Sequence, residues 1–215
     1  CLKGASGVDD IYLRKIKEHE PDLVVILDCP VLNQELIDQI HVPIVWIDHH
    51  TPLDRKGVKY YNPMILDKKD NRSTSYWCYQ VAQEEKDVWI AVLGVVSDWQ
   101  VPDFLDKFPY PGLLNKKNTA PEIFFESDLG RLIKAFTFVL KGKTSEVRSC
   151  INMLEQIESP YDILQEKTPK GKYIYKKFLK LNKEYEDILQ KALKHKPKDD
   201  VYVFTYPITR TSFTS

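Results

Sequence analysis

The sequence has no net charge, no long apolar run and few cysteines, and each absence excludes a class of protein. Its 215 residues include 31 basic and 31 acidic side chains, which argues against a polybasic protein that holds nucleic acid by bulk charge. The longest apolar run, residues 88–96, is far shorter than a membrane span requires. The four cysteines form no C-x-x-C pair, so we expect free thiols in a reducing cytoplasm.

The composition is otherwise that of a folded protein whose charge is unevenly shared. Hydrophobic residues make up 43% of the chain and charged residues 29%, which suits one good-sized core. Residues 1–100 carry 11 Lys/Arg and 16 Asp/Glu, whereas residues 101–215 carry 20 and 15. The neutral total therefore hides an acidic front part and a basic back part.

Helix and strand patterns alternate in the front part. Residues 9–20 and 33–40 have apolar side chains at helical spacing. The runs at 23–27 and 44–47 are continuously apolar, which is typical of parallel strands buried on both faces. A shorter strand is predicted at 58–61. We therefore expect an α/β fold with a parallel sheet flanked by helices and right-handed crossovers.

The rest of the chain is predicted to be helical, with one strand near its end. Residues 196–200 are expected to be a linker, and residues 201–206 a new strand. The predicted helices are residues 73–85, 88–96, 123–140, 145–157 and 172–194.

Ionisable residues follow both apolar runs of the front part. Asp28 ends the first run, and Asp48, His49 and His50 end the second. Since the carboxyl ends of parallel strands meet at one edge of a sheet, these side chains should converge there. Carboxylates and imidazoles together suit a divalent ion such as Mn²⁺, Mg²⁺ or Zn²⁺. A single Asp at the end of a strand is explained equally well as a helix cap or a turn residue. Three consecutive ionisable groups after an apolar strand, in contrast, bring no packing benefit that would explain them.

These motifs resemble those of the DHH phosphoesterases, the RecJ-like superfamily. The resemblance extends over roughly residues 9–100. Four segments match in the family's order: VVILD at 24–28, VWIDHH at 45–50, Asn62-Pro63 followed by Ser73-Thr74-Ser75, and GVVSD at 94–98.

The resemblance implies a Mn²⁺-dependent phosphodiesterase or exonuclease that holds two ions, with Mg²⁺ or Co²⁺ as other possible metals. Asp28 would bridge the two ions, and His49 and Asp98 would complete the ligands of the second. His50 would contact the scissile phosphate, while Asp48 would orient the histidines.

Substrate phosphate would meet the helix that starts near residue 73. Arg72, Ser73, Thr74 and Ser75 are the predicted substrate-binding residues, through their N–H groups and the guanidinium. A plain helix cap explains the three hydroxyl residues equally well.

Two features depart from the family pattern. No Asp-x-Asp motif precedes Asp28, and the family's spacing would place it upstream of Cys1. We therefore expect the sequence to be a piece of a longer protein, and by itself to hold at most one ion weakly and turn over little. Trp99 follows Asp98 where small-substrate members commonly carry a hydroxyl residue, which weakens a pyrophosphatase interpretation.

The predicted domains are a DHH-type catalytic domain at 1–157, a helical connector at 158–199 and the first strand of a smaller substrate-binding domain at 200–215. The basic excess at residues 167–198 is either a solvated helix face or one wall of a nucleic-acid channel.

The function that we expect is hydrolysis of single-stranded nucleic acid or of a short oligonucleotide by a RecJ-like nuclease. Two alternatives stay open: a cyclic-dinucleotide phosphodiesterase, and a catalytically inactive relative that acts as a scaffold in a replication assembly. No membrane association is expected, and the sequence leaves the oligomeric state open.

Overall fold

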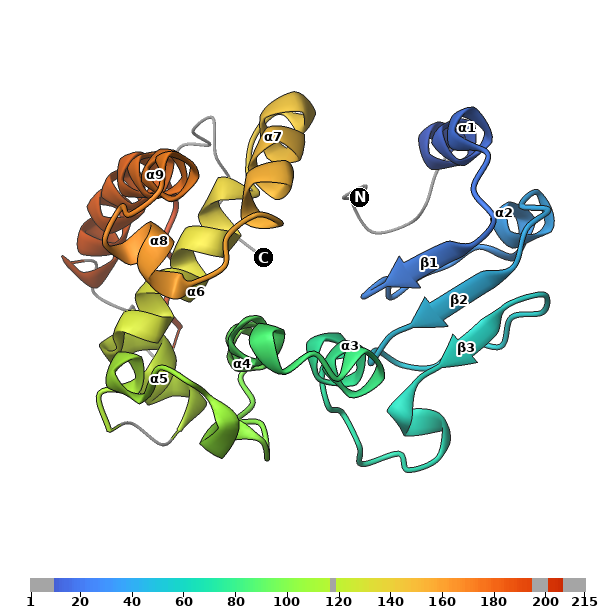
Figure 1. Ribbon diagram of the computed structural model, residues 1–215, viewed down its shortest axis with the longest axis horizontal. Helices are drawn as coiled ribbons and strands as arrows, with labels where there is room; N and C mark the ends of the chain where they lie inside the picture. The colour runs from blue at the N-terminus through green and yellow to red at the C-terminus, as the bar shows by residue number, and fades with distance from the viewer. Residues whose placement is uncertain (1–9, 117–118, 195–200, 207–215) are drawn as a thin grey trace. The chain divides into compact units, whose positions relative to one another are not determined.

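A computed structural model describes residues 10–116, 119–194 and 201–206 of the chain. The chain divides into two compact units, residues 2–127 and residues 128–215. We call them the first unit and the helical unit, and each is described by itself. Figure 1 labels the elements of both in chain order.

A small parallel sheet is the centre of the first unit. Its strands are β1 (Val24–Leu27), β2 (Ile44–Ile47) and β3 (Lys59–Tyr61), and β2 lies between the other two (Figure 1). Val24 lies beside Ile44 in the register, so the carboxyl ends of β1 and β2 meet at one edge. The predicted α/β fold with a parallel sheet is confirmed, and so is the short third strand.

Two helices cover one face of this sheet. They are α1 (Asp10–His19) and α2 (Gln34–Asp38), both close to the predicted bounds. The indole of Trp46 stacks on the ring of Tyr60 at 3.8 Å, and its N–H donates to the carbonyl of Cys29 at 3.2 Å. The buried core on this face consists of Leu13, Leu32, Leu36, Ile37, Ile40, Ile44 and Trp46.

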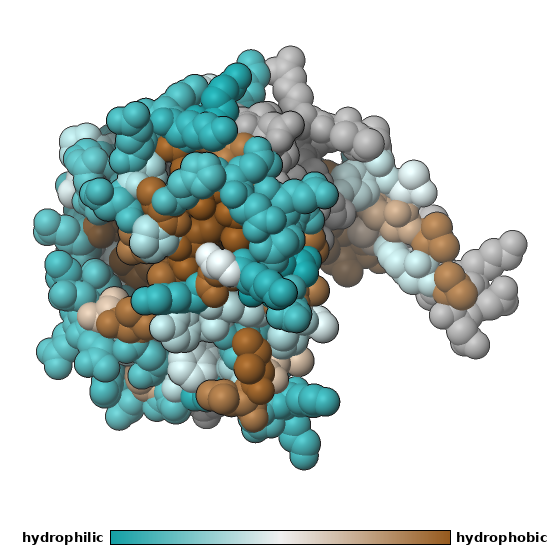
Figure 2. Space-filling view, turned by 90° about the vertical axis from the view of Figure 1, so that its right-hand side faces the viewer, coloured by the Kyte–Doolittle hydropathy of each residue, from teal (hydrophilic) through white to brown (hydrophobic). Residues whose placement is uncertain are grey.

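The other face of the sheet is open at β1. Val25 is 51% exposed and Leu27 is 49% exposed, so side chains of β1 alternate between covered and open. The prediction that this strand is buried on both faces is therefore wrong, because β1 is an edge strand that the described residues cover on the side of α1 and α2. Burial on both faces describes β2 better than β1, since Trp46 in β2 is fully buried. Figure 2 views the side that carries the sheet in Figure 1 and shows apolar surface framed by polar side chains.

Three further helices complete the first unit: α3 (Thr74–Ala82), α4 (Val88–Ser97) and α5 (Ala120–Glu126). The predicted buried helix is confirmed as α4, which crosses α3 closely: a Cβ on Gly94 would lie 2.4 Å from the Ser75 hydroxyl. Short 3₁₀ turns connect the elements: η1 (Pro63–Ile65), η2 (Glu85–Asp87), η3 (Leu105–Lys107) and η4 (Pro111–Leu114).

The helical unit consists of α6 (Asp128–Val139), α7 (Thr144–Leu154), α8 (Pro160–Leu164) and α9 (Pro169–Lys194). The long helix α9 is confirmed, and α6, α7 and α8 all pack on it. For that reason α6 and α7 belong to the helical unit, whereas the predicted boundary lay after residue 157.

Two predictions for the back part are wrong. A single helix was expected over 123–140, but Ser127 is extended (φ −123°, ψ 163°) and separates α5 from α6. Its hydroxyl donates to the carbonyl of Ile123 at 2.5 Å, which closes α5. A strand was expected over 201–206, but only Val201 forms a bridge there and residues 202–206 have no regular structure. The predicted linker at 196–200 lies outside the described residues.

Within the described ranges, every helix is too short or too polar to cross a membrane.

Candidate metal centre

Asp28 lies at the carboxyl end of β1, where the backbone turns sharply. Its φ of 55° is in the left-handed region, which Asp tolerates better than most residues. The backbone N–H of Asp28 still donates to Ile47 at 3.0 Å, so the strand ends at this residue. The hydroxyl of Thr74 donates to Asp28 Oδ1 at 3.1 Å. The carboxylate is therefore fixed from α3 while 57% of its side chain stays exposed.

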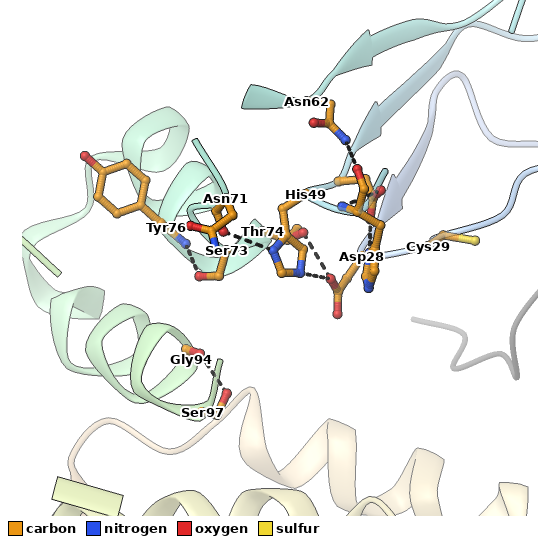
Figure 3. A network of polar contacts seen from close by, with 12 residues as sticks. Asp28, Cys29, His49, Asn62, Asn71, Ser73, Thr74, Tyr76, Gly94 and Ser97 are labelled. Carbon is orange, nitrogen blue, oxygen red and sulfur yellow. Dashed lines mark hydrogen bonds and ion pairs between the residues drawn. The ribbon is translucent and has the colours of Figure 1, made fainter. Parts of the chain in front are cut away.

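His49 forms an ion pair with this carboxylate. Its Nε2 lies 3.4 Å from Asp28 Oδ1, and its Nδ1 lies 3.3 Å from the carbonyl of Asn71 (Figure 3). The Asp28 carboxylate raises the pKa of His49 to about 9, helped by the Asn71 carbonyl and by the charge of Asp98, while burial opposes the rise. In return, the hydrogen bond from His49 lowers the pKa of Asp28.

Asp48 fixes the second histidine. Its side chain is fully buried, and Oδ1 lies 2.8 Å from His50 Nδ1, while Oδ2 accepts the backbone N–H of His50 at 3.1 Å. The amide of Asn62 donates to the carbonyl of His50 at 2.8 Å. Because Nδ1 is engaged, Nε2 is the nitrogen of His50 that can contact a metal ion or a phosphate oxygen.

Three of the predicted residues come together in one group. Ligand atoms of Asp28, His49 and His50 all lie within 4.8 Å of one another. The two imidazole rings are 4.6 Å apart and inclined by 62°. Ligands of one ion at bond lengths of about 2 Å lie at most about 4 Å apart, so small side-chain rotations bring these atoms to a common ion.

Asp98 caps the end of α4 and lies outside this group of three. Its charge nevertheless acts on His49, and burial raises the pKa of the Asp98 carboxyl, with a further rise from the charge of Asp28. The structure therefore places a second carboxylate near the centre without bringing it into direct contact.

The four predicted substrate-binding residues have different surroundings. Thr74 contacts the centre through Asp28. Ser73 caps α3 by accepting the N–H of Tyr76, and Ser75 faces Gly94. The guanidinium of Arg72 is held by both oxygens of Asp70, donates to the Tyr76 hydroxyl and lies over the Tyr76 and Trp77 rings. Phosphate binding by these residues stays a prediction, since most donors of Arg72 are already occupied.

Two residues that hold the centre, Asn71 and Gln100, were not predicted. Gln100 donates to the carbonyl of Asn71 at 2.7 Å and accepts the backbone N–H of Ser73 at 3.1 Å. The Asn71 carbonyl also faces His49, so Gln100 helps to fix that histidine. Because these contacts join distant parts of the sequence, only the position of Gln100, two residues after the motif at 94–98, indicated such a role.

No family model matches the chain, and no curated protein matches it significantly. The likeness to the DHH phosphoesterases therefore rests on the four sequence segments. The geometry described above is a separate observation.

Proposed function

We propose that the chain carries the centre of a divalent-metal-dependent phosphoesterase that hydrolyses phosphodiester bonds. One observation carries the proposal: a carboxylate and two imidazoles converge within 4.8 Å at the carboxyl ends of β1 and β2. Such an edge of a parallel sheet is where α/β proteins bind ligands.

The donor set fits a hard or borderline divalent ion. Asp28 offers a carboxylate oxygen, and His49 and His50 offer imidazole nitrogens, which suits Mn²⁺ and also Co²⁺ or Mg²⁺. A bound ion of this kind polarises a phosphoryl oxygen and lowers the pKa of a water molecule. Asp98 is the candidate further ligand, since its charge acts on the same histidine.

The protein's own groups position the donors. Thr74 holds the Asp28 carboxylate, and the Asn71 carbonyl holds the ring of His49. Asp48 holds His50 so that Nε2 can meet a phosphate oxygen. Pre-positioned donors of this kind need little rearrangement when the substrate arrives.

Single-stranded nucleic acid or a short oligonucleotide is the substrate that we favour. The support is the resemblance to RecJ-like nucleases. In the helical unit by itself, exposed lysines recur at helical spacing on α9, and ammonium groups in a row attract a phosphate backbone: Lys172, Lys176, Lys180 and Lys183.

The test is hydrolysis of a labelled short oligonucleotide and of a cyclic dinucleotide with Mn²⁺, alongside calorimetry of Mn²⁺ binding. It compares the protein with His49→Ala and with His41→Ala, a matched change at an exposed histidine of the same unit. We expect His49→Ala to abolish Mn²⁺ binding and hydrolysis, and His41→Ala to leave both unchanged. Binding of Mn²⁺ without hydrolysis of either substrate, in the full-length protein, would favour a non-catalytic binding protein.

A further inference from the structure

Three aromatic side chains of the first unit form an exposed cluster, which we call the aromatic shelf: Trp99, Phe124 and Phe125. The ring of Trp99 lies 5.0 Å from that of Phe124 and 5.8 Å from that of Phe125, at inclinations of 33° and 37°. Trp99 is 56% exposed and Phe125 is 60% exposed. Large aromatic side chains that gather in the open commonly mark a binding surface.

Trp99 occupies a backbone position that normally takes glycine. The helix α4 ends in a Schellman motif, in which the N–H of Gln100 donates to Val95 at 3.2 Å and the N–H of Trp99 donates to Val96 at 3.1 Å. Trp99 has a φ of 62°, in the left-handed region that a bulky residue rarely adopts. An exposed tryptophan in a strained position is unfavourable for the fold, and strained backbone of this kind is found most often at functional sites.

Both neighbours of Trp99 act on residues of the candidate metal centre. Asp98 acts electrostatically on His49. Gln100 is hydrogen-bonded to the Asn71 carbonyl and to the N–H of Ser73. The backbone that carries Trp99 is therefore fixed to the centre through Gln100, and the shelf begins one residue from Asp98, a candidate ligand.

We infer that the shelf stacks on a nucleobase of the substrate and so selects phosphodiesters that carry a nucleoside. This inference rests on the proposed phosphodiesterase function. An exposed aromatic ring suits a base beside a phosphate without regard to sequence, because every base has a π-face. Inorganic pyrophosphate and phosphodiesters of simple alcohols offer no such ring.

The probe is a 5′-phosphorylated dinucleotide, compared with the same compound in which both bases are replaced by hydrogen. Trp99→Gly is the main variant, since glycine relieves the strained position and keeps the helix end. Trp99→Phe keeps a ring, and Tyr173→Ala changes an exposed aromatic residue of the helical unit. Binding without metal is measured by calorimetry, and KM and kcat are measured with Mn²⁺.

We expect Trp99→Gly to weaken binding of the dinucleotide and raise its KM about tenfold, with no effect on the abasic compound and no loss of thermal stability. Trp99→Phe should lose much less affinity for the dinucleotide, and Tyr173→Ala should leave this affinity unchanged. Equal affinity of the unchanged protein for both compounds would overturn the inference, and metal-dependent hydrolysis would still support the proposed function.

The opposite pattern separates the two ideas. The protein could bind the dinucleotide through its bases, lose this binding in Trp99→Gly, and yet hydrolyse neither compound. That result would support base binding by the shelf and contradict the proposed phosphodiesterase function. If Trp99→Gly instead abolishes self-association in analytical ultracentrifugation and leaves dinucleotide affinity unchanged, the shelf is a contact between copies of the chain and the inference fails.

Discussion

The two units differ in what they bury. Among the described residues, all the buried polar side chains lie in the first unit: Asp48, Asn62, Ser73, Thr74 and Ser127. The described core of the helical unit is mainly apolar, although Arg131 of α6 donates to the buried Tyr175 of α9 and Lys177 of α9 pairs with Glu146 of α7. Burying a polar group costs stability unless it is hydrogen-bonded. The first unit therefore carries a network of buried polar side chains that close packing alone does not require, whereas the described polar contacts of the helical unit surround a mainly apolar core.

This difference in buried polar side chains predicts how each unit responds to mutation. A defect in the helical unit should alter stability alone, whereas a defect in the polar network of the first unit should alter metal binding as well. All four tryptophans lie in the first unit, so their emission reports on that unit, while circular dichroism reports on helices of both.

The largest effect on stability is expected at Gly171. A Cβ at this position of α9 would lie 1.9 Å from the backbone carbonyl of Asp162 in α8. Gly171→Ala should therefore force α8 and α9 apart and lower the free energy of unfolding by about 3 kcal/mol. In urea titrations, the circular dichroism transition should shift while the tryptophan transition and the Mn²⁺ affinity stay unchanged. Gly112→Ala, with nothing within 4 Å, is the matched control.

The next largest effect is expected at Asp48, a fully buried residue whose carboxylate holds His50 at Nδ1. Asp48→Asn keeps the volume but weakens the hydrogen bond to Nδ1, so Mn²⁺ affinity should fall about 10–100-fold. Calorimetry measures this, with Asp22→Asn, a change at an exposed aspartate of the same unit, as the control. An unchanged affinity would show that the orientation of His50 does not matter for metal binding.

Much of the first unit could be predicted from local patterns. The apolar runs at 23–27 and 44–47 correctly predicted adjacent parallel strands, and the sheet edge then brought Asp28 and His49 together. Apolar composition could not predict the open face of β1, because burial depends on which elements cover a strand. The role of Gln100 also could not be predicted, since its contacts bridge residues far apart in the sequence.

The helical unit was predictable because its core is mainly apolar. Apolar residues at helical spacing are enough to identify α9 and α7. The break at Ser127 was missed because the apolar pattern runs through it, and only the backbone conformation separates α5 from α6.

Helix caps allow a smaller and more direct comparison of the units. Ser73 caps α3 by accepting the N–H of Tyr76, and Ser159 caps α8 by accepting the N–H of Tyr161. Changing either serine to alanine should lower the free energy of unfolding by about 1 kcal/mol. Only Ser73→Ala should also weaken Mn²⁺ binding, because α3 carries Thr74 against Asp28. Equal effects of both variants on Mn²⁺ affinity would contradict the division between the units.

The smallest effect is the pH dependence of the metal-free protein. The pKa of His49 is raised to about 9 in the fold, compared with about 6.5 for an unfolded chain. The ion pair with Asp28 therefore adds stability that is fully present below about pH 6.5 and is lost as the pH rises through about 9. Its size should be at most about 1 kcal/mol, because 57% of the Asp28 side chain is exposed.

Nuclear magnetic resonance titration of the imidazole protons, with a chelator present, measures this shift. Asp28→Asn removes the first cause of the raised pKa, so the His49 resonance should then titrate at a clearly lower pH. Because a metal ion must displace the proton from His49, Mn²⁺ affinity should rise with pH over the same interval. The helical unit has no histidine among its described residues, so its own unfolding transition should stay flat there. A parallel change in both transitions would mean that the titrating group is not the Asp28–His49 pair.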